Sequence, residues 1–247
     1  MNRFAVGYEY ICRIIMMVVV AHIAFIVHTV LGLGVVGFFP SIAALHTTYR
    51  TWLLDVADRS WTIKQTWTVF HRAWKAELKS ANLFGYPQFA LWALLIWEYY
   101  LTNWNDFGPI GYGLSGALLV INIFYGLFVM VSWVLRSNFD EKPIWIVKAS
   151  LQMVVARPLN SLMTVILFLV MVWAYYTWPG LAAAFGVSVP AFIAMMVAYS
   201  YARLPGMDVH VIEPLEDRQR RRAERKAEDQ RRADERRAAR EQARKKR

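Results

Sequence analysis

Long runs of apolar residues with almost no charge recur through the first 212 residues of the chain. A helix needs about 20 apolar residues to cross the hydrocarbon core of a bilayer, and five runs reach that length. They cover residues 14–39, 84–104, 112–135, 159–178 and 181–202. Glycine and proline weaken the last run as an isolated helix, but both are tolerated inside a bundle. The pattern predicts an all-α, polytopic membrane protein with about five transmembrane helices.

Between these runs, apolar residues fall at every third or fourth position, which is typical of amphipathic helices. Near the start of residues 61–82, Thr62 is followed three positions later by Gln65, the spacing of a capping box. Five apolar residues share one side of this helix: Ile63, Trp67, Phe70, Trp74 and Leu78. Five basic or imidazole residues follow its flank: Lys64, His71, Arg72, Lys75 and Lys79. We expect residues 41–57 and 143–156 to form similar surface-lying helices.

The sequence allows two locations for the helix over residues 61–82. A helix with aromatic residues on one side and bases at its edge can lie in the membrane interface, where lysine stems reach up to anionic lipid headgroups. It can instead pack on the cytoplasmic ends of the helical bundle. In both positions it would lie close to the bilayer, which is the first expected partner of the chain.

Positive charge is unevenly distributed along the chain, whose formal net charge is +10. Residues 213–247 alone hold fifteen Lys and Arg against nine Asp and Glu. Lys and Arg also gather in residues 40–83 and 136–158, whereas the connections 105–111 and 179–180 have none. Because cytoplasmic loops collect Lys and Arg, we expect the basic segments and the C-terminus to be cytoplasmic. Five spans then place the N-terminus outside.

The basic tail over residues 213–247 would suggest a nucleic-acid partner in a soluble protein. Here it follows a membrane bundle, and acids stand four positions before many of its bases, which favours a solvated, charged helix that binds no nucleic acid. Attraction to anionic lipid and docking of a cytoplasmic partner are the alternatives. The most basic positions of the tail are Arg220, Arg221, Arg222, Arg244, Lys245, Lys246 and Arg247.

Two stretches of the chain, GLGVVGFFPSIAALHTTYRTWLL over residues 32–54 and WTVFHRAWKAELKSAN over residues 67–82, resemble the YesL-like family of bacterial integral membrane proteins. In that family an apolar helix passes through a small-residue turn and a proline into an Ala-rich segment, and an aromatic, basic helix follows. The matching positions are Gly37, Pro40, Ala43, Ala44, Tyr49 and Arg50, then Phe70, Arg72, Trp74 and Lys75. The resemblance implies a bacterial inner-membrane protein of unassigned activity, often encoded beside sugar-uptake ABC transporters and glycoside hydrolases.

Polar residues within the apolar runs are the candidates for a site, because an ionisable group at the bilayer centre costs roughly 2.5 to 3.5 kcal/mol. They are His22, His28, Glu98 and Asn122. Similar depths in the membrane would bring His22, Glu98 and Asn122 together, where they could bind a polar ligand or relay a proton. Interhelical hydrogen bonds, and positions that face lipid or water, are the alternatives.

Motifs of soluble enzymes are missing from the sequence, and the single cysteine, Cys12, has no partner for a disulfide or a zinc pair. We therefore expect no catalytic residue, no metal and no cofactor. The leading hypothesis is a non-enzymatic accessory protein that supports the assembly, stability or regulation of a carbohydrate ABC permease, and the carbohydrate link comes from the resemblance alone. A small transporter with an intramembrane polar site, and a scaffold that docks a partner through its tail, are the alternatives.

Overall fold

A computed structural model describes residues 3–55, 60–105, 107–201 and 230 of the chain. Within these ranges every regular element is an α-helix, which confirms the predicted all-α fold class. The helices are α1 (Arg3–Leu31), α2 (Val35–Leu54), α3 (Ile63–Glu77), α4 (Ser80–Trp104), α5 (Gly108–Asn138), α6 (Pro143–Ala156), α7 (Pro158–Thr177), α8 (Pro179–Phe185) and α9 (Ser188–Tyr201). They belong to one compact unit, Met1–Leu204. The predicted tail helix, with the basic residues at 220–222 and 244–247, lies outside the described residues.

Three of the described helices are long and apolar enough to cross a membrane: α1 over Ile11–Leu31, α5 and α7. The helices α8 and α9 pass the same test only as a pair bent by 72°, so the described residues contain up to four spans. The run predicted over residues 84–104 lies in α4, which is not among them, because its tryptophans, tyrosines and amides lower its mean hydropathy. A helical membrane protein is therefore supported, whereas the count of about five spans is not confirmed.

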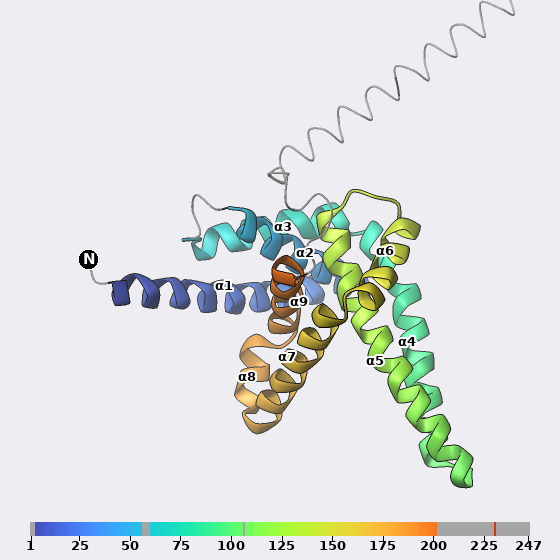
Figure 1. Cartoon of the computed structure of the whole chain (residues 1–247). Helices are drawn as coiled ribbons and strands as arrows, with labels where there is room; N and C mark the ends of the chain where they lie inside the picture. Colours follow the sequence, from blue (N-terminus) through green and yellow to red (C-terminus); the bar gives the residue numbers. More distant parts are fainter. Residues whose placement is uncertain (1–2, 56–59, 106, 202–229, 231–247) are drawn as a thin grey trace, which may run out of the picture. The chain divides into compact units, whose positions relative to one another are not determined.

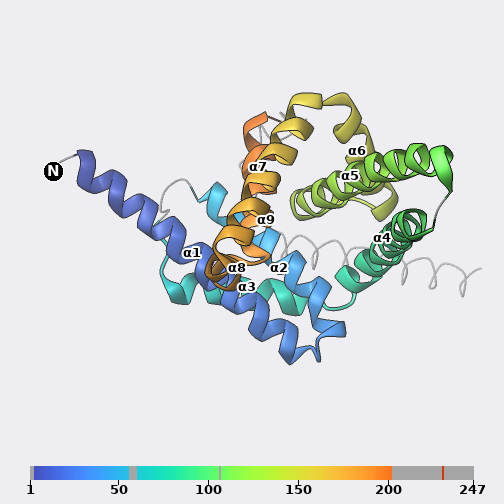
Figure 2. The same ribbon diagram turned by 90° about the horizontal axis from the view of Figure 1, so that it is seen from below.

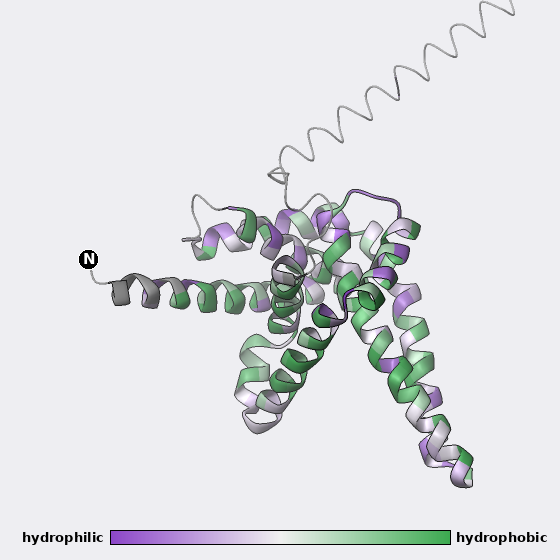
Figure 3. Ribbon diagram, viewed as in Figure 1, coloured by the Kyte–Doolittle hydropathy of each residue, from purple (hydrophilic) through white to green (hydrophobic). Residues whose placement is uncertain are grey.

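The helices of this unit run in two main directions. α4 and α5 lie side by side as a long hairpin, and α7 packs with α8 and α9 (Figure 1). α1 and α3 run crosswise to that hairpin, and α3 lies near the end of α4 that is remote from the turn between α4 and α5, as Figures 1 and 2 both show. Apolar residues dominate α1, α5 and α7, whereas hydrophilic residues recur along α3 (Figure 3). The most polar of these helices thus lies at one end of the apolar hairpin.

The apolar run predicted as one helix over residues 14–39 is broken in the structure. Leu33 and Gly34 both have positive φ angles, 56° and 75°, a conformation that ends a helix. A Cβ on Gly32 would lie 2.3 Å from the Cα atom of Gly37, so glycine is required where the two backbones approach each other. The run therefore contains the end of α1, a reversal of the chain and the beginning of α2.

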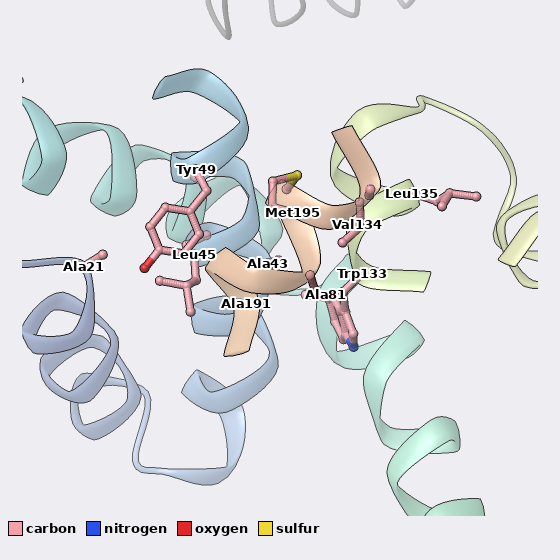
Figure 4. Close-up of a cluster of buried hydrophobic side chains, with 14 of the residues drawn as sticks. Ala21, Ala43, Leu45, Tyr49, Ala81, Trp133, Val134, Leu135, Ala191 and Met195 are labelled. Carbon is pink, nitrogen blue, oxygen red and sulfur yellow. The ribbon is translucent and has the colours of Figure 1, made fainter. Parts of the chain in front are cut away.

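α2 is enclosed by its neighbours, with twelve of its 20 residues buried. It contacts α1, α3, α4, α5 and α9. The small residues Ala43 and Ala44 are among the buried ones, and Figure 4 shows Leu45 and Tyr49 between α1 and α9. Because a helix that is covered on all sides is a core element, the structure differs from the surface-lying helix predicted over residues 41–57. Small side chains let neighbouring helices approach α2 from several directions.

α3 begins with the predicted capping box. The Thr62 hydroxyl accepts a hydrogen bond from the Gln65 backbone N–H, and the Gln65 side-chain oxygen accepts one from the Thr62 N–H at 2.7 Å. Phe70 and Trp74 are buried where α3 packs on α1 and α2. The aromatic side of α3 therefore lies against protein, which is the second of the two positions expected for this helix.

α6 spans residues 143–156, the range in which a surface-lying helix was predicted. Four of its exposed apolar residues form a stripe at spacings of three and four: Ile144, Val147, Leu151 and Val155. An apolar stripe of this kind suits the boundary between headgroups and acyl chains. Its opposite side packs on α5 and α7.

Pro40 lies inside α2, where it lacks the backbone N–H that would bond to the carbonyl four residues earlier. That carbonyl, of Val36, accepts a hydrogen bond from the Asn82 side chain at 2.8 Å. The neighbouring carbonyl of Val35 accepts one from the Tyr86 hydroxyl at 2.6 Å. Both donors come from α4, so α4 completes the hydrogen bonding of the first turns of α2.

Replacing Asn82 by Ala should lower the free energy of unfolding by about 0.5 to 1.5 kcal/mol, because the Val36 carbonyl would lose its partner. In a Pro40→Ala background the same change should cost less, since the backbone N–H gained at position 40 can bond to Val36. A double-mutant cycle, measured by denaturation of the full-length protein in detergent micelles, gives this difference. Equal costs in the two backgrounds would contradict the role assigned to Asn82.

Candidate functional site

The four polar residues predicted within the spans lie apart in the structure. His22 and His28 are buried on α1, and each has neighbours of its own. Asn122 of α5 donates a hydrogen bond to the carbonyl of Leu95 on α4 at 3.2 Å, and Glu98 is exposed on α4. Among the described residues, no hydrogen bond or ion pair joins any two of these four. The arrangement favours separate interhelical contacts over one polar cluster.

His28 is 1% exposed and uses both nitrogens of its ring. The Nδ1 atom lies 2.8 Å from the Ala24 carbonyl, and a carbonyl only accepts, so Nδ1 carries the proton. In the neutral ring Nε2 must then accept the hydrogen bond, 2.9 Å long, from Nδ1 of His71 on α3. The Nε2 atom of His71 is left as an acceptor at the half-buried edge of α3.

Three aromatic side chains of α3 surround the His28 ring. The ring centroids of Trp67, Phe70 and Trp74 lie 5.3, 5.1 and 5.3 Å from that of His28. The aromatic side of α3 that the sequence predicts therefore packs around the buried His28 ring of α1. His71 was noted only as part of the basic flank, although its place next to Phe70, at the edge of the apolar side, was the available signal for this contact.

Tyr49 connects three helices through one chain of hydroxyl groups. Ser188, at the start of α9, donates to the Val18 carbonyl of α1 at 2.7 Å and accepts from the Tyr49 hydroxyl. Tyr49 and Ser188 are both 0% exposed. Burial raises the pKa of Tyr49 well above its usual range, so the hydroxyl keeps its proton and acts as the donor. Nothing in the sequence linked these two positions, which are 139 residues apart.

The bend between α8 and α9 packs on α1. Gly186 has a φ of 26°, and a Cβ at this position would lie 2.3 Å from Cε1 of His22. The Tyr175 hydroxyl of α7 donates to the Gly186 carbonyl at 3.0 Å. His22 is 6% exposed, and its ring fills the space beside the glycine so closely that not even a methyl group has room. His22 therefore serves the packing of the bend.

All six residues of the family-like motif in α2 are buried. They are Gly37, Pro40, Ala43, Ala44, Tyr49 and Arg50. A Cβ on Gly37 would lie 2.7 Å from the His28 carbonyl, so this glycine allows α1 and α2 to touch. Arg50 is 1% exposed and thus holds its charge inside the protein. The motif residues therefore serve to pack α2 against the helices around it.

A half-buried ion pair ties the end of α3 to α5. The Glu77 carboxylate lies 2.8 Å from the Arg136 guanidinium, with side chains that are 20% and 16% exposed. The guanidinium carbon also stands 5.4 Å from the ring centre of Phe84 and 5.6 Å from that of Trp133, within the range of cation–π attraction. The cationic residues Arg72, Lys75 and Lys79 of the same segment are exposed.

Groups that could bind a ligand are few in the described part of the chain. It contains no set of three or more His, Cys, Asp or Glu side chains placed to hold a metal ion, and Cys12 is exposed. A shallow groove of about 510 Å³ on α4 is lined by Phe89, Trp92, Ala93, Ile96, Trp97 and Tyr100. The groove suits an apolar occupant, whereas the buried polar groups above bond helix to helix.

His46 is a buried histidine of α2, and its Nδ1 donates to the Ile42 carbonyl at 2.9 Å. Burial lowers the pKa of His46 from its ordinary value of 6.5 to about 4, against the opposing effect of this hydrogen bond. The unfolded chain thus takes up a proton at a higher pH than the native protein does. The native state loses stability on this account as the pH falls from 6.5 towards 4.

A His46→Gln variant should lack this pH dependence. Relative to the variant, the wild type should lose about 3 kcal/mol of unfolding free energy between pH 7 and pH 4, because only the wild type has the suppressed protonation. Denaturant titrations of both proteins at several pH values in one detergent measure the difference. A stability difference that is constant across this pH range would show that His46 is accessible to protons in the native state.

Replacing Tyr49 by Phe should lower the free energy of unfolding by about 1 to 3 kcal/mol, because Ser188 would lose its hydrogen-bond donor in the core. Tyr112→Phe is the matched control, since Tyr112 is 83% exposed and its hydroxyl takes no part in the hydrogen bonds that join Tyr49, Ser188 and Val18. Thermal unfolding of both variants in detergent should show a loss for the first and no loss for the second. Equal midpoints would mean that the hydroxyl chain adds nothing to stability.

Comparison with known proteins shows a similarity to one family and to one bacterial protein, neither of which has an assigned activity. Residues 18–99 match the family model described as "Protein of unknown function, DUF624". The chain is also similar to the "Uncharacterized protein YteU" of Bacillus subtilis (strain 168), with 26% identity over 189 residues that cover 76% of this chain and 82% of that protein. No solved structure matches. The segment from within α1 to within α4 is therefore similar to the DUF624 family of unknown function, and this match bears out the YesL-like resemblance of residues 32–54 and 67–82.

Proposed function

We propose that the protein is a non-enzymatic accessory protein of the bacterial inner membrane, which supports the assembly, stability or regulation of a membrane partner. The observation that carries the proposal is the use of the buried polar groups. His28 and Tyr49 are buried and Asn82 is half-buried, and each of them bonds a side chain or carbonyl on another helix. Polar groups committed in this way build a packed scaffold, and they do not line a path for a solute.

The proposed partner is a carbohydrate ABC permease, a class that the YesL-like resemblance implies. The groove on α4 offers a surface for such a partner, because a transmembrane helix can pack where a small residue, here Ala93, lies among large ones. The groove lies on α4, which packs on α5, and α5 is one of the helices that are apolar enough to cross a membrane. We therefore assign the groove to a transmembrane helix of the partner.

We further propose that the ends of the hairpin that lie near α3 face the cytoplasm. Exposed lysines occur on α3 and α6, whereas the connections between α4 and α5 and between α7 and α8 contain no Lys or Arg. This difference supports a cytoplasmic position for the basic helices and for the C-terminus. The external N-terminus that the sequence predicts follows only if α1 crosses the bilayer together with the other spans.

An Ala93→Trp variant tests the accessory role and the groove together. The full-length protein, solubilised in mild detergent from its host membranes, should bring down permease subunits in a fixed ratio, which mass spectrometry identifies. Filling the groove should reduce that recovery about ten-fold, the loss that corresponds to roughly 1.4 kcal/mol of binding free energy. Leu119→Trp, on the exposed apolar surface of α5, is the control and should bind as the wild type does.

Recovery of the protein alone, stable in the same detergent, would argue against an accessory role. If Ala93→Trp leaves the recovery of the permease unchanged, the accessory role stands, but the permease must bind at a surface other than the groove. Solute flux through the purified, reconstituted protein that Glu98→Ala abolishes would favour the transporter hypothesis instead.

A further inference from the structure

One side of α3 carries a continuous stripe of exposed residues, four of which are cations. The stripe consists of Lys64, Thr68, Arg72, Lys75 and Lys79, all of them exposed. Their spacings of four, four, three and four place them on one face of a helix. Leu78 and Lys79 keep right-handed helical backbone angles, so the face continues past the end of α3. At 1.5 Å per residue the α3 stripe is about 22 Å long.

The opposite side of α3 fixes the direction in which the stripe points. Phe70, Ala73 and Trp74 are buried against the neighbouring helices, and His71 bonds to His28 of α1. A helix held on this side cannot turn its aromatic residues into a bilayer. The cations are therefore presented outward on a fixed support, and insertion of aromatic residues into lipid is not how α3 contacts the membrane.

Three of the four cations of the α3 stripe have no counter-ion within the described part of the protein. The acid nearest to the stripe on the same helix, Glu77, pairs with Arg136 of α5. Lys64, Lys75 and Lys79 form no ion pair with any described residue. Three unpaired ammonium groups and a guanidinium on one face attract an anionic partner that extends along the whole stripe.

The surroundings of α3 indicate which anionic partner that is. The chain passes from the end of the stripe directly into α4, which runs beside the candidate span α5. α1, which packs on α3, exposes an apolar surface that includes Ile15, Ile23 and Ile26. Because α3 lies at one end of the hairpin of α4 and α5 (Figure 1), the α3 stripe lies near one end of the candidate span α5. Phosphate headgroups of a bilayer lie at this level, and lysine stems can bend towards them.

We propose that the α3 stripe binds the headgroups of anionic phospholipids at the membrane surface. The site selects negatively charged over zwitterionic lipid, and it is separate from the basic tail. The inference is independent of which protein partner the groove on α4 receives. Lipid binding of this electrostatic kind weakens as salt is added, because exposed charges are screened within about 10 Å at 0.1 M ionic strength.

The test measures the lipid that the full-length protein retains. The protein is reconstituted in nanodiscs of equimolar phosphatidylglycerol and phosphatidylcholine, and native mass spectrometry gives the ratio of the two lipids that remain bound. The wild type should retain more phosphatidylglycerol. The variant Lys64→Gln/Arg72→Gln/Lys75→Gln/Lys79→Gln should lower the ratio at least about five-fold, the factor expected when a single cation loses its headgroup.

A variant of the tail is the matched control. Arg244→Gln/Lys245→Gln/Lys246→Gln/Arg247→Gln removes the same four charges and should leave the ratio within about two-fold of the wild type. The double variant Lys64→Gln/Lys75→Gln, at exposed positions without an ion pair in the described structure, should give an intermediate ratio if the fourfold variant does not fold. Inorganic phosphate in excess should not displace the retained phosphatidylglycerol, because the site needs headgroups fixed in a bilayer.

Three outcomes overturn the proposal. An unchanged ratio in the stripe variants, with loss of an acidic protein from material isolated from native membranes, would assign the stripe to a protein partner. Equal losses in the stripe and tail variants would reduce the effect to the net charge of the chain. A loss in the tail variant alone would place the lipid site in the tail.

Discussion

The enclosure of α2, with its polar groups bonded to the helices around it, is the constraint on which the described fold depends. Glycines at 32 and 37 let α1 and α2 touch. Asn82 replaces the hydrogen bond that Pro40 cannot donate, and Tyr49 reaches α9 and, through Ser188, α1. In apolar surroundings an unpaired polar group costs several kcal/mol. The neighbours of α2 are therefore held in place by hydrogen-bond partners as well as by packing.

The helices that the sequence predicts well are those whose signals are local. The apolar runs within α5 and α7, the capping box of α3 and the extent of α6 all depend on residues a few positions apart. The enclosure of α2 could not be predicted in this way, because Arg50, His46 and its threonines make the segment resemble a surface helix. The break at Leu33 and Gly34 lies in an uninterrupted apolar run. Hydropathy does not predict backbone angles, so it could not show this break.

For the candidate site too, the sequence predicted the local features but not the contacts that depend on how the helices pack. Hydropathy selected His22, His28, Glu98 and Asn122 because each is polar within an apolar run, and a similar depth suggested that they meet. Depth, however, fixes only one coordinate, and residues on different helices at one depth can lie on opposite sides of a bundle. Their actual partners, such as His71 for His28, depend on how α1 and α3 pack. No spacing along the sequence contains that information.

The central claim, that α2 is enclosed by protein, is tested most directly by cysteine labelling at Ala44, which is 0% exposed. Single cysteines at Ala44 and at the exposed Thr68 of α3 are introduced into a Cys12→Ala background. Each variant in native membranes is treated with a water-soluble and with a lipid-soluble maleimide. The account predicts that the cysteine at Ala44 reacts with neither reagent, whereas the cysteine at Thr68 reacts with the water-soluble one. Rapid labelling at Ala44 by either reagent would place α2 at a water or lipid surface and contradict the fold described above.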